Sequence, residues 1–126
     1  MNEPTTHELV NFKGTHLSSL RIGIASTHVA FSRSNQDGES ELLHISIFSP
    51  FKLVLGTRKL SGVGTDPYSV SHLIPCLNLE VKEVNFIERV LTFVFIDGSE
   101  LVIKPRNDCY ESYIIHLPDI PGGIII

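Results

Sequence analysis

The chain has 126 residues, a size typical of one domain, and folding at this size hides roughly two-thirds of the surface of the unfolded chain. Hydrophobic residues make up 42% of the sequence and charged residues 19%, which excludes an intrinsically disordered chain. The net charge of −4 and the pI of about 5.8 argue against nucleic-acid binding, which usually needs a basic surface.

The ends and the cysteines indicate a cytoplasmic protein without disulfide bonds. The N-terminus lacks the basic and apolar segments of a signal peptide, and no apolar run approaches the roughly 20 residues of a membrane-spanning helix. Cys76 and Cys109 alone do not form a secreted disulfide framework. We expect a single domain over 1–126, in which the polar residues 1–13 form a loose N-terminal arm.

The first half of the chain alternates apolar and polar residues, the pattern of strands with one buried face. The alternation covers residues 20–24, 28–33, 42–47 and 51–55, which are four predicted strands. The polar cluster 34–40 contains Asp-Gly and predicts a hairpin loop longer than two residues.

The middle of the chain contains the one helix that the sequence predicts. Residues 61–65 include two glycines and are expected to be a flexible connection. Asp66 can then cap a helix that begins at Pro67, a position that needs no backbone donor. Apolar residues recur at spacings of three and four, and Pro75 limits the helix to about two turns.

The strongest predicted element is a hairpin between the runs 90–96 and 99–104, which are rich in β-branched and aromatic residues. The Asp-Gly dipeptide between them predicts a type I′ turn, with Ile96 opposite Ser99. This register makes both faces of the hairpin apolar near its middle. We therefore expect the hairpin in the interior of a sheet and not at its edge.

Further strands are predicted on both sides of this hairpin. They cover 79–87, with a turn at Glu88-Arg89, then 110–116, and a short terminal strand at 124–126 that must pair within the domain or with a second copy in a homodimer. The total of about seven or eight strands and one short helix predicts a mainly β (α+β) fold. We expect a single antiparallel β-sandwich or a partly open barrel.

No catalytic or cofactor-binding residue is predicted. His72 and Cys76 have a spacing that could form a thiol–base pair on a helix, but the apolar neighbours of Cys76 favour a buried, inert thiol. The Gly62–Gly64 segment lacks the spacing and the lysine of a phosphate-binding loop. Asp97 and Glu100 flank a turn, where solvated carboxylates are normal. We expect a protein that is not an enzyme and has no cofactor.

The six histidines do not predict a metal site by their spacing, because none forms an HxH, HxxxH or HExxH motif. One alternative stays open. Separate strands could bring His28, His44 and His116 together with a carboxylate, although isolated histidines in a β domain are usually surface or core residues.

Acidic side chains gather in three places and are the candidate partner-binding residues. These residues are Asp37, Glu39, Glu41, Glu80, Glu83, Asp97 and Glu100. Charged surface residues steer association with a partner of opposite charge and set its specificity. We therefore expect a basic protein partner, and neither nucleic acid nor a membrane.

About half of the chain, from Leu53 onward, resembles a loosely defined group of small β-rich bacterial proteins, many of unknown function. The resembling features are the strand Phe51–Leu55, the helix at Asp66-Pro67, the run 91–103, Tyr110-Glu111-Ser112-Tyr113 and Pro121-Gly122-Gly123. Tyr113 stands where tryptophan is commoner in the group.

Proteins of this group often lie beside secreted bacterial toxins and are thought to include immunity proteins of contact-dependent and other polymorphic toxin systems. The resemblance implies that the chain binds a cognate toxin domain, such as a nuclease, and blocks it by steric occlusion. It carries over no interface residue, because immunity contacts differ from one pair to the next. The alternative is a stand-alone small-ligand-binding or regulatory β domain, with the helix over a small pocket.

Overall fold

The computed structural model describes residue 9 and residues 12–35, 38–106, 111–118 and 120–126. Its elements are β1 (His16–Gly23), β2 (Ser26–Asn35), β3 (Gly38–Ile47), β4 (Pro50–Leu55), β5 (Arg58–Val63), the 3₁₀ helix η1 (Pro67–Cys76), β6 (Val81–Ile87), β7 (Val90–Phe95), β8 (Glu100–Ile103), β9 (Tyr113–Leu117) and β10 (Ile120–Ile125).

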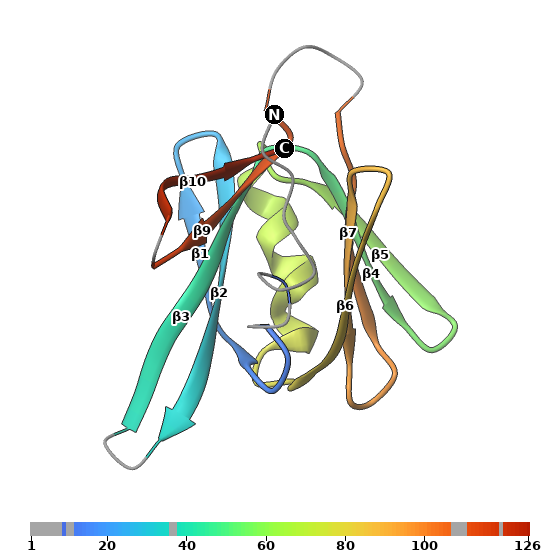
Figure 1. The fold of residues 1–126 in the computed structure, drawn as a ribbon. Coiled ribbons are helices and arrows are strands. Elements are labelled where there is room, and N and C mark those ends of the chain that lie inside the picture. The colour runs from blue at the N-terminus through green and yellow to red at the C-terminus, as the bar shows by residue number, and fades with distance from the viewer. Residues whose placement is uncertain (1–8, 10–11, 36–37, 107–110, 119) are drawn as a thin grey trace.

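The strands form two five-stranded antiparallel sheets. Sheet A has the order β1-β2-β3-β9-β10, and sheet B has the order β5-β4-β8-β7-β6. Figure 1 shows the two sheets spread apart with η1 lying between them. The mainly β sandwich with one short helix is therefore confirmed, with more strands than the sequence predicted.

Apolar side chains from both sheets meet in one buried cluster. Phe31 of β2 and Phe93 of β7 stack with ring centroids 4.7 Å apart, and Phe12 meets them edge-on at 5.3 and 5.0 Å. Phe12 lies in the segment expected to be a loose arm, but it is fully buried, and Leu9 is buried as well. Leu9 and Phe12 thus belong to the hydrophobic core.

The β7–β8 hairpin is interior to sheet B, as predicted, but its predicted register is wrong by one residue. Val94 lies opposite Glu100 and Phe93 opposite Leu101. The amide of Gly98 donates to the carbonyl of Phe95, and Gly98, at φ 89°, is the loop residue with positive φ. This is a three-residue loop and not a type I′ turn. Consequently one face of the hairpin is buried, and the other is partly exposed.

Positive φ at two successive residues, which a type I′ turn requires, occurs instead at Glu88-Arg89. The flanking residues Ile87 and Val90 pair directly, so the predicted turn at this position is confirmed and is two residues long. The loop expected at 34–40 is shorter than predicted, because β2 and β3 pair through Asn35 and Gly38. Asp37, between them, lies outside the described residues.

The expected flexible connection at 61–65 is wrong, because Ser61 to Val63 belong to β5, which pairs with β4. Beyond β5, the amide of Gly64 donates to the carbonyl of Ser49, and the Gly64 carbonyl accepts from the Thr27 hydroxyl. A Cβ on Gly64 would meet the Ile47 carbonyl oxygen at far less than van der Waals distance. Glycine is thus required here for close packing and not for flexibility.

The predicted helix exists and is capped as expected, but it is longer. The Asp66 carboxylate accepts from the Tyr68 amide, and η1 spans ten residues, about three turns of a 3₁₀ helix. Pro75 is tolerated in the last turn, because the next bond, from the Leu77 amide to the Ile74 carbonyl, does not need its nitrogen. The tighter period buries Leu73 and Cys76 and leaves Ile74 exposed.

The C-terminal isoleucines pair within the chain, which is one of the two expected alternatives. Ile124 lies opposite Ile115 and Ile125 opposite Ile114, so β10 forms an edge of sheet A beside β9. Ile124 and Ile126 are buried, whereas Ile125 is half-exposed.

Substitution of Gly64 tests the tight packing of its backbone against Ile47. We expect Gly64→Ala to lower the free energy of unfolding by about 1–3 kcal/mol, because Cβ displaces the β3–β4 backbone. Urea denaturation measures the change, with Thr65→Ala, at the exposed neighbouring position, as the control. A Gly64→Ala variant as stable as the natural chain would contradict the packing argument.

Candidate functional site

The structure divides the predicted acidic residues between the two sheets. Glu39 and Glu41 lie on β3 of sheet A, whereas Glu83 and Glu100 lie on sheet B. Glu80 precedes β6, and Asp97 lies in the β7–β8 loop.

Four of these carboxylates gather at the β7–β8 end of sheet B, which we call the acidic end (Glu80, Glu83, Asp97 and Glu100). Glu83 and Glu100 both lie opposite Val94, one on each side of β7. The Ile96 amide donates to the Glu80 carbonyl at 3.0 Å, which places Glu80 beside the loop.

The acidic end also presents an apolar residue, since Ile96, which bonds to the Glu80 carbonyl and precedes Asp97 in the loop, is 61% exposed. Asp97 also holds the loop, because its Oδ1 accepts from the Ser99 amide. Sequence reasoning did not predict that Ile96 would point to solvent. The one-residue difference in register explains this, because Ile96 belongs to the loop and not to the strand.

Glu39 and Glu41 differ from the acidic end, because each has a side-chain partner. Glu39 Oε1 accepts a hydrogen bond from His16 Nε2 at 2.7 Å, and Glu41 Oε1 forms an ion pair with Arg21 Nη2 at 3.1 Å. No such pair involves the carboxylates of the acidic end within the described part of the chain. The acidic end thus carries the less compensated negative charge.

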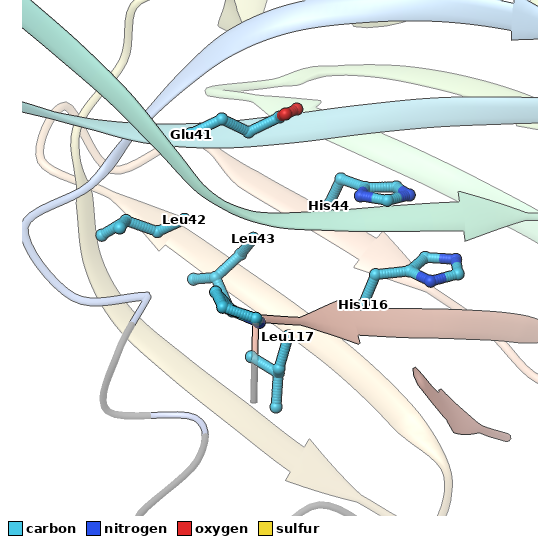
Figure 2. Close-up of a pocket in the computed structure, with 7 residues that line it drawn as sticks. Glu41, Leu42, Leu43, His44, His116 and Leu117 are labelled. Atoms are coloured by element: carbon cyan, nitrogen blue, oxygen red, sulfur yellow. The ribbon is translucent and has the colours of Figure 1, made fainter. Parts of the chain in front are cut away.

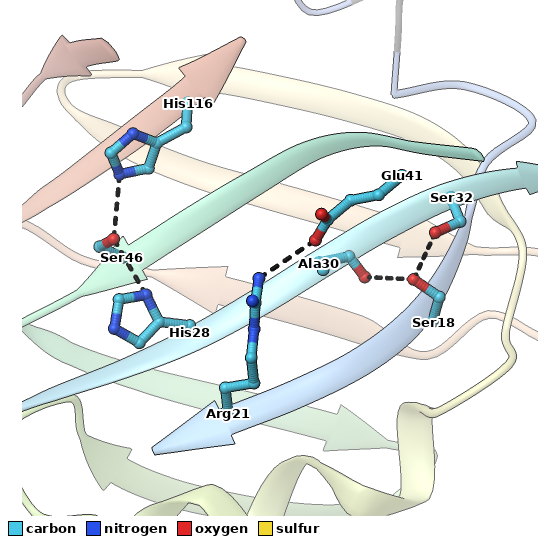
Figure 3. Close-up of polar contacts among 8 residues, drawn as sticks. All are labelled: Ser18, Arg21, His28, Ala30, Ser32, Glu41, Ser46 and His116. Atoms are coloured by element: carbon cyan, nitrogen blue, oxygen red, sulfur yellow. Dashed lines mark hydrogen bonds and ion pairs between the residues drawn. The ribbon is translucent and has the colours of Figure 1, made fainter. Parts of the chain in front are cut away.

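The outer face of sheet A carries a histidine row, formed by His28, His44, His116 and Ser46. Ser46 Oγ lies 3.1 Å from His28 Nδ1 and 3.0 Å from His116 Nε2, so one hydroxyl bridges two imidazoles (Figure 3). The rings of His44 and His116 stack with centroids 4.0 Å apart. Sheet formation therefore does bring these three histidines together.

The strand registers explain this row. His44 lies directly opposite His116, and Ser46 lies opposite His28, while Ala30 opposite His44 leaves room for the rings. Positions 44 and 46 are two residues apart and share one face of β3. Glycine at 123 leaves room beside His116, since a Cβ there would approach His116 Nδ1 to 3.2 Å. Only the register between β3 and β9, which the sequence does not display, completes the row.

Partial burial lowers the pKa of each of the three histidines. Burial is the main cause for His28, whose pKa the nearby Arg21 guanidinium and His116 lower further. For His44 the pKa is lowered by burial and by His116, against an opposing effect of Glu41. Burial alone lowers the pKa of His116. The row is therefore predominantly neutral at neutral pH.

The row does not form a metal centre in this arrangement. Among the described residues, no three histidine, cysteine or acidic side chains are placed to hold a metal ion. The lone pairs of the stacked His44 and His116 rings lie in two nearly parallel planes, which does not favour a common ligand point between them. Glu41, the nearby carboxylate, pairs with Arg21 instead.

Ser46 is also poorly placed as a nucleophile, although it contacts two potential bases. Its residue is 5% exposed and lies within β3, which is paired on both sides by β2 and β9. The backbone amides of such a strand are used in the ladders and cannot form an oxyanion hole.

An open pocket of about 230 Å³ lies beside the histidine row (Figure 2). His44 and His116 form one side, and Glu41, Leu42, Leu43, Leu117 and Pro118 form the rest. Leu42 is the extra residue of a bulge in β3, which explains its position at the rim. The pocket is smaller than typical small-molecule sites and lies on sheet A, not under the helix as the ligand-binding alternative expected.

Cys76 is buried, as predicted. Its thiol donates to the Leu73 carbonyl at 2.9 Å, and burial raises the pKa of the thiol to about 12. His72 Nδ1 bonds to the Ser61 carbonyl instead, at 2.7 Å. The candidate thiol–base pair is therefore not formed, and Cys109 lies outside the described residues.

Comparison with known proteins finds no matching family model, no matching curated protein and no matching solved structure. The resemblance to toxin-associated proteins therefore stays a prediction. No helix in the described ranges is long and apolar enough to cross a membrane.

Alkylation tests the inert thiol. In a Cys109→Ser variant, which leaves Cys76 as the one thiol of the chain, we expect iodoacetamide to react at neutral pH only after unfolding in urea. The reason is that the thiolate is the reactive species and a pKa of about 12 suppresses it. Mass spectrometry follows the reaction, and rapid labelling of the folded protein would restore the catalytic alternative.

The lowered histidine pKa values predict a stability that decreases in acid. The unfolded histidines have a pKa near 6.5, so below that pH the unfolded state binds more protons than the folded state until the folded histidines titrate as well. This contribution to stability is complete above pH 6.5 and is lost as the pH falls through the lower folded-state pKa.

Urea denaturation across this pH range measures the effect. We expect His116→Gln to have a weaker pH dependence than the natural chain, and His72→Gln, far from the row, to leave the dependence unchanged. Equal pH dependence in all three proteins would show that the row is not its source.

Proposed function

We propose that this protein binds and blocks a basic protein domain, as immunity proteins bind their toxins in the cytoplasm. The observation that carries the proposal is the acidic end of sheet B, where Ile96 is 61% exposed beside Glu80 and Asp97, and Glu83 and Glu100 flank the nearby Val94. An apolar centre with a charged rim is the usual anatomy of a protein interface. The predicted resemblance adds the class of partner.

The electrostatics of the surface support a basic partner. The chain carries a net charge of −4, and Glu39 and Glu41, which have side-chain partners, lie on the other sheet. Lys82, beside Glu83, and Lys59, across Val54 from Glu100, are the nearest cations by strand register. Uncompensated surface charge accelerates association with an opposite surface and decides which partner binds.

The mechanism is occlusion by a rigid surface. Ile96 would enter an apolar depression on the partner, and the carboxylates of the acidic end would pair with lysines or arginines around it. The β7–β8 loop suits this role, because the Asp97–Ser99 bond and the Gly98–Phe95 bond fix its conformation before binding. A loop that is already ordered loses little entropy in the complex.

Co-expression tests the function itself. The chain is produced together with the product of the gene immediately upstream, and growth and co-purification are measured. We expect growth to be rescued and a stable complex to form. A toxic neighbour that is neither bound nor neutralised would refute the proposal.

Charge reversal tests the surface. We expect the double variant Glu80→Lys with Glu83→Lys to reduce the association rate constant about tenfold or more at low salt, with a smaller effect at high salt, because it reverses the steering charge. The double variant Glu39→Lys with Glu41→Lys is the charge-matched control, since both residues are exposed and lie on β3 of sheet A. If the Glu80→Lys with Glu83→Lys variant associates as fast as the natural chain, the interface does not lie at the acidic end.

A further inference from the structure

The histidine row has no part in the proposed interface, because it lies on sheet A and the acidic end lies on sheet B. Three imidazoles in mutual contact on one face still constitute an unusual concentration of groups that change charge near neutral pH. Their hydrogen bonds and their stacking determine how many protons they accept.

Ser46 couples two of the imidazoles through a single hydroxyl proton. Its Oγ contacts His28 Nδ1 and His116 Nε2, so it can donate to one ring while accepting from the other. His28 Nε2 in turn contacts Ser26 Oγ at 2.9 Å. These bonds can therefore form with neutral rings, His28 acting once as donor and once as acceptor and His116 bonding through Nε2.

The stack of His44 and His116 tolerates one positive charge but not two. A single imidazolium is stabilised against a neutral aromatic ring, whereas two imidazolium rings with centroids 4.0 Å apart repel each other. Protons on this pair must therefore bind one after the other. The second proton favours separation of the rings.

The surrounding charges do not remove this repulsion. From β1, Arg21 lies opposite His28 and adds a positive charge, and from β3, Glu41 contributes a negative charge, the one that acts on His44 among the described residues, which is paired with Arg21. The neighbouring described positions on β2, β9 and β10 carry Ala30, Ile114 and Ile125, which are uncharged. Protonation thus accumulates positive charge on this face.

We propose that the histidine row is a proton-operated switch, in which a second proton on the His44–His116 pair separates the two rings and converts the outer face of sheet A into a cationic surface. The ring separation would also widen the adjoining pocket, because His44 and His116 form one of its sides. This device is independent of whether the acidic end binds a toxin.

Nuclear magnetic resonance of the folded, isotope-labelled protein tests the switch. We expect contacts between the His44 and His116 rings at neutral pH, and a two-step titration of this pair. In acid these contacts disappear, while contacts between Phe31 and Phe93 in the core persist. Loss of both sets together would indicate global unfolding and would overturn the local switch.

Variants separate coupling from simple burial. His116→Gln should convert the titration of His44 into a single step and raise its midpoint, because the His116 ring that lowers the pKa of His44 is gone. His72→Gln, whose ring bonds to the Ser61 carbonyl, is the matched control and should change nothing. An unchanged His44 titration in His116→Gln, or rings that stay stacked after both have titrated in the natural chain, would overturn the proposal.

Discussion

The structure depends on the packing of three aromatic rings between the sheets. Phe31 of sheet A and Phe93 of sheet B stack directly, and Phe12 closes the gap beside them. All three rings are fully buried, so β2, which carries Phe31, and β7, which carries Phe93, cannot slip by one residue without turning a large apolar side chain to solvent. The core contacts therefore fix the register of β2 and β7, and through the ladders the register of their neighbours.

The outer faces follow from this inner constraint. In sheet A, Val29, Ile45 and Ile115 lie side by side and point inward, so the alternate positions 28, 44, 46 and 116 must point outward together. In sheet B, inward Phe93 and Leu101 leave Val94 and Glu100 on the outside. Both polar surfaces thus result from the same requirement. The apolar residues at every second position of the strands must fill the space between the sheets.

Local signals predicted the elements better than their pairing. The alternation of residues identified most strands, and Asp66-Pro67 identified the helix start, because these features depend on neighbours in sequence. The β7–β8 register was mispredicted because Asp-Gly fits both a two-residue and a three-residue loop, and packing selects the latter. β5 was missed because its glycine was interpreted as flexibility, whereas Gly62 lies tightly against Ser69 and Phe51. The contact between His44 and His116 joins strands 72 positions apart and has no local signal.

Protons on the histidine row would alter the charge of the whole molecule, and this links the two surfaces. The formal charge of −4 counts all histidines as neutral, so three protons on the histidine row would leave −1. A distant basic partner responds to the total field, whereas a docked partner responds to adjacent charges. If the proposed complex forms at the acidic end, acid would therefore slow the encounter more than it would weaken the formed complex, because the histidine row lies on the other sheet.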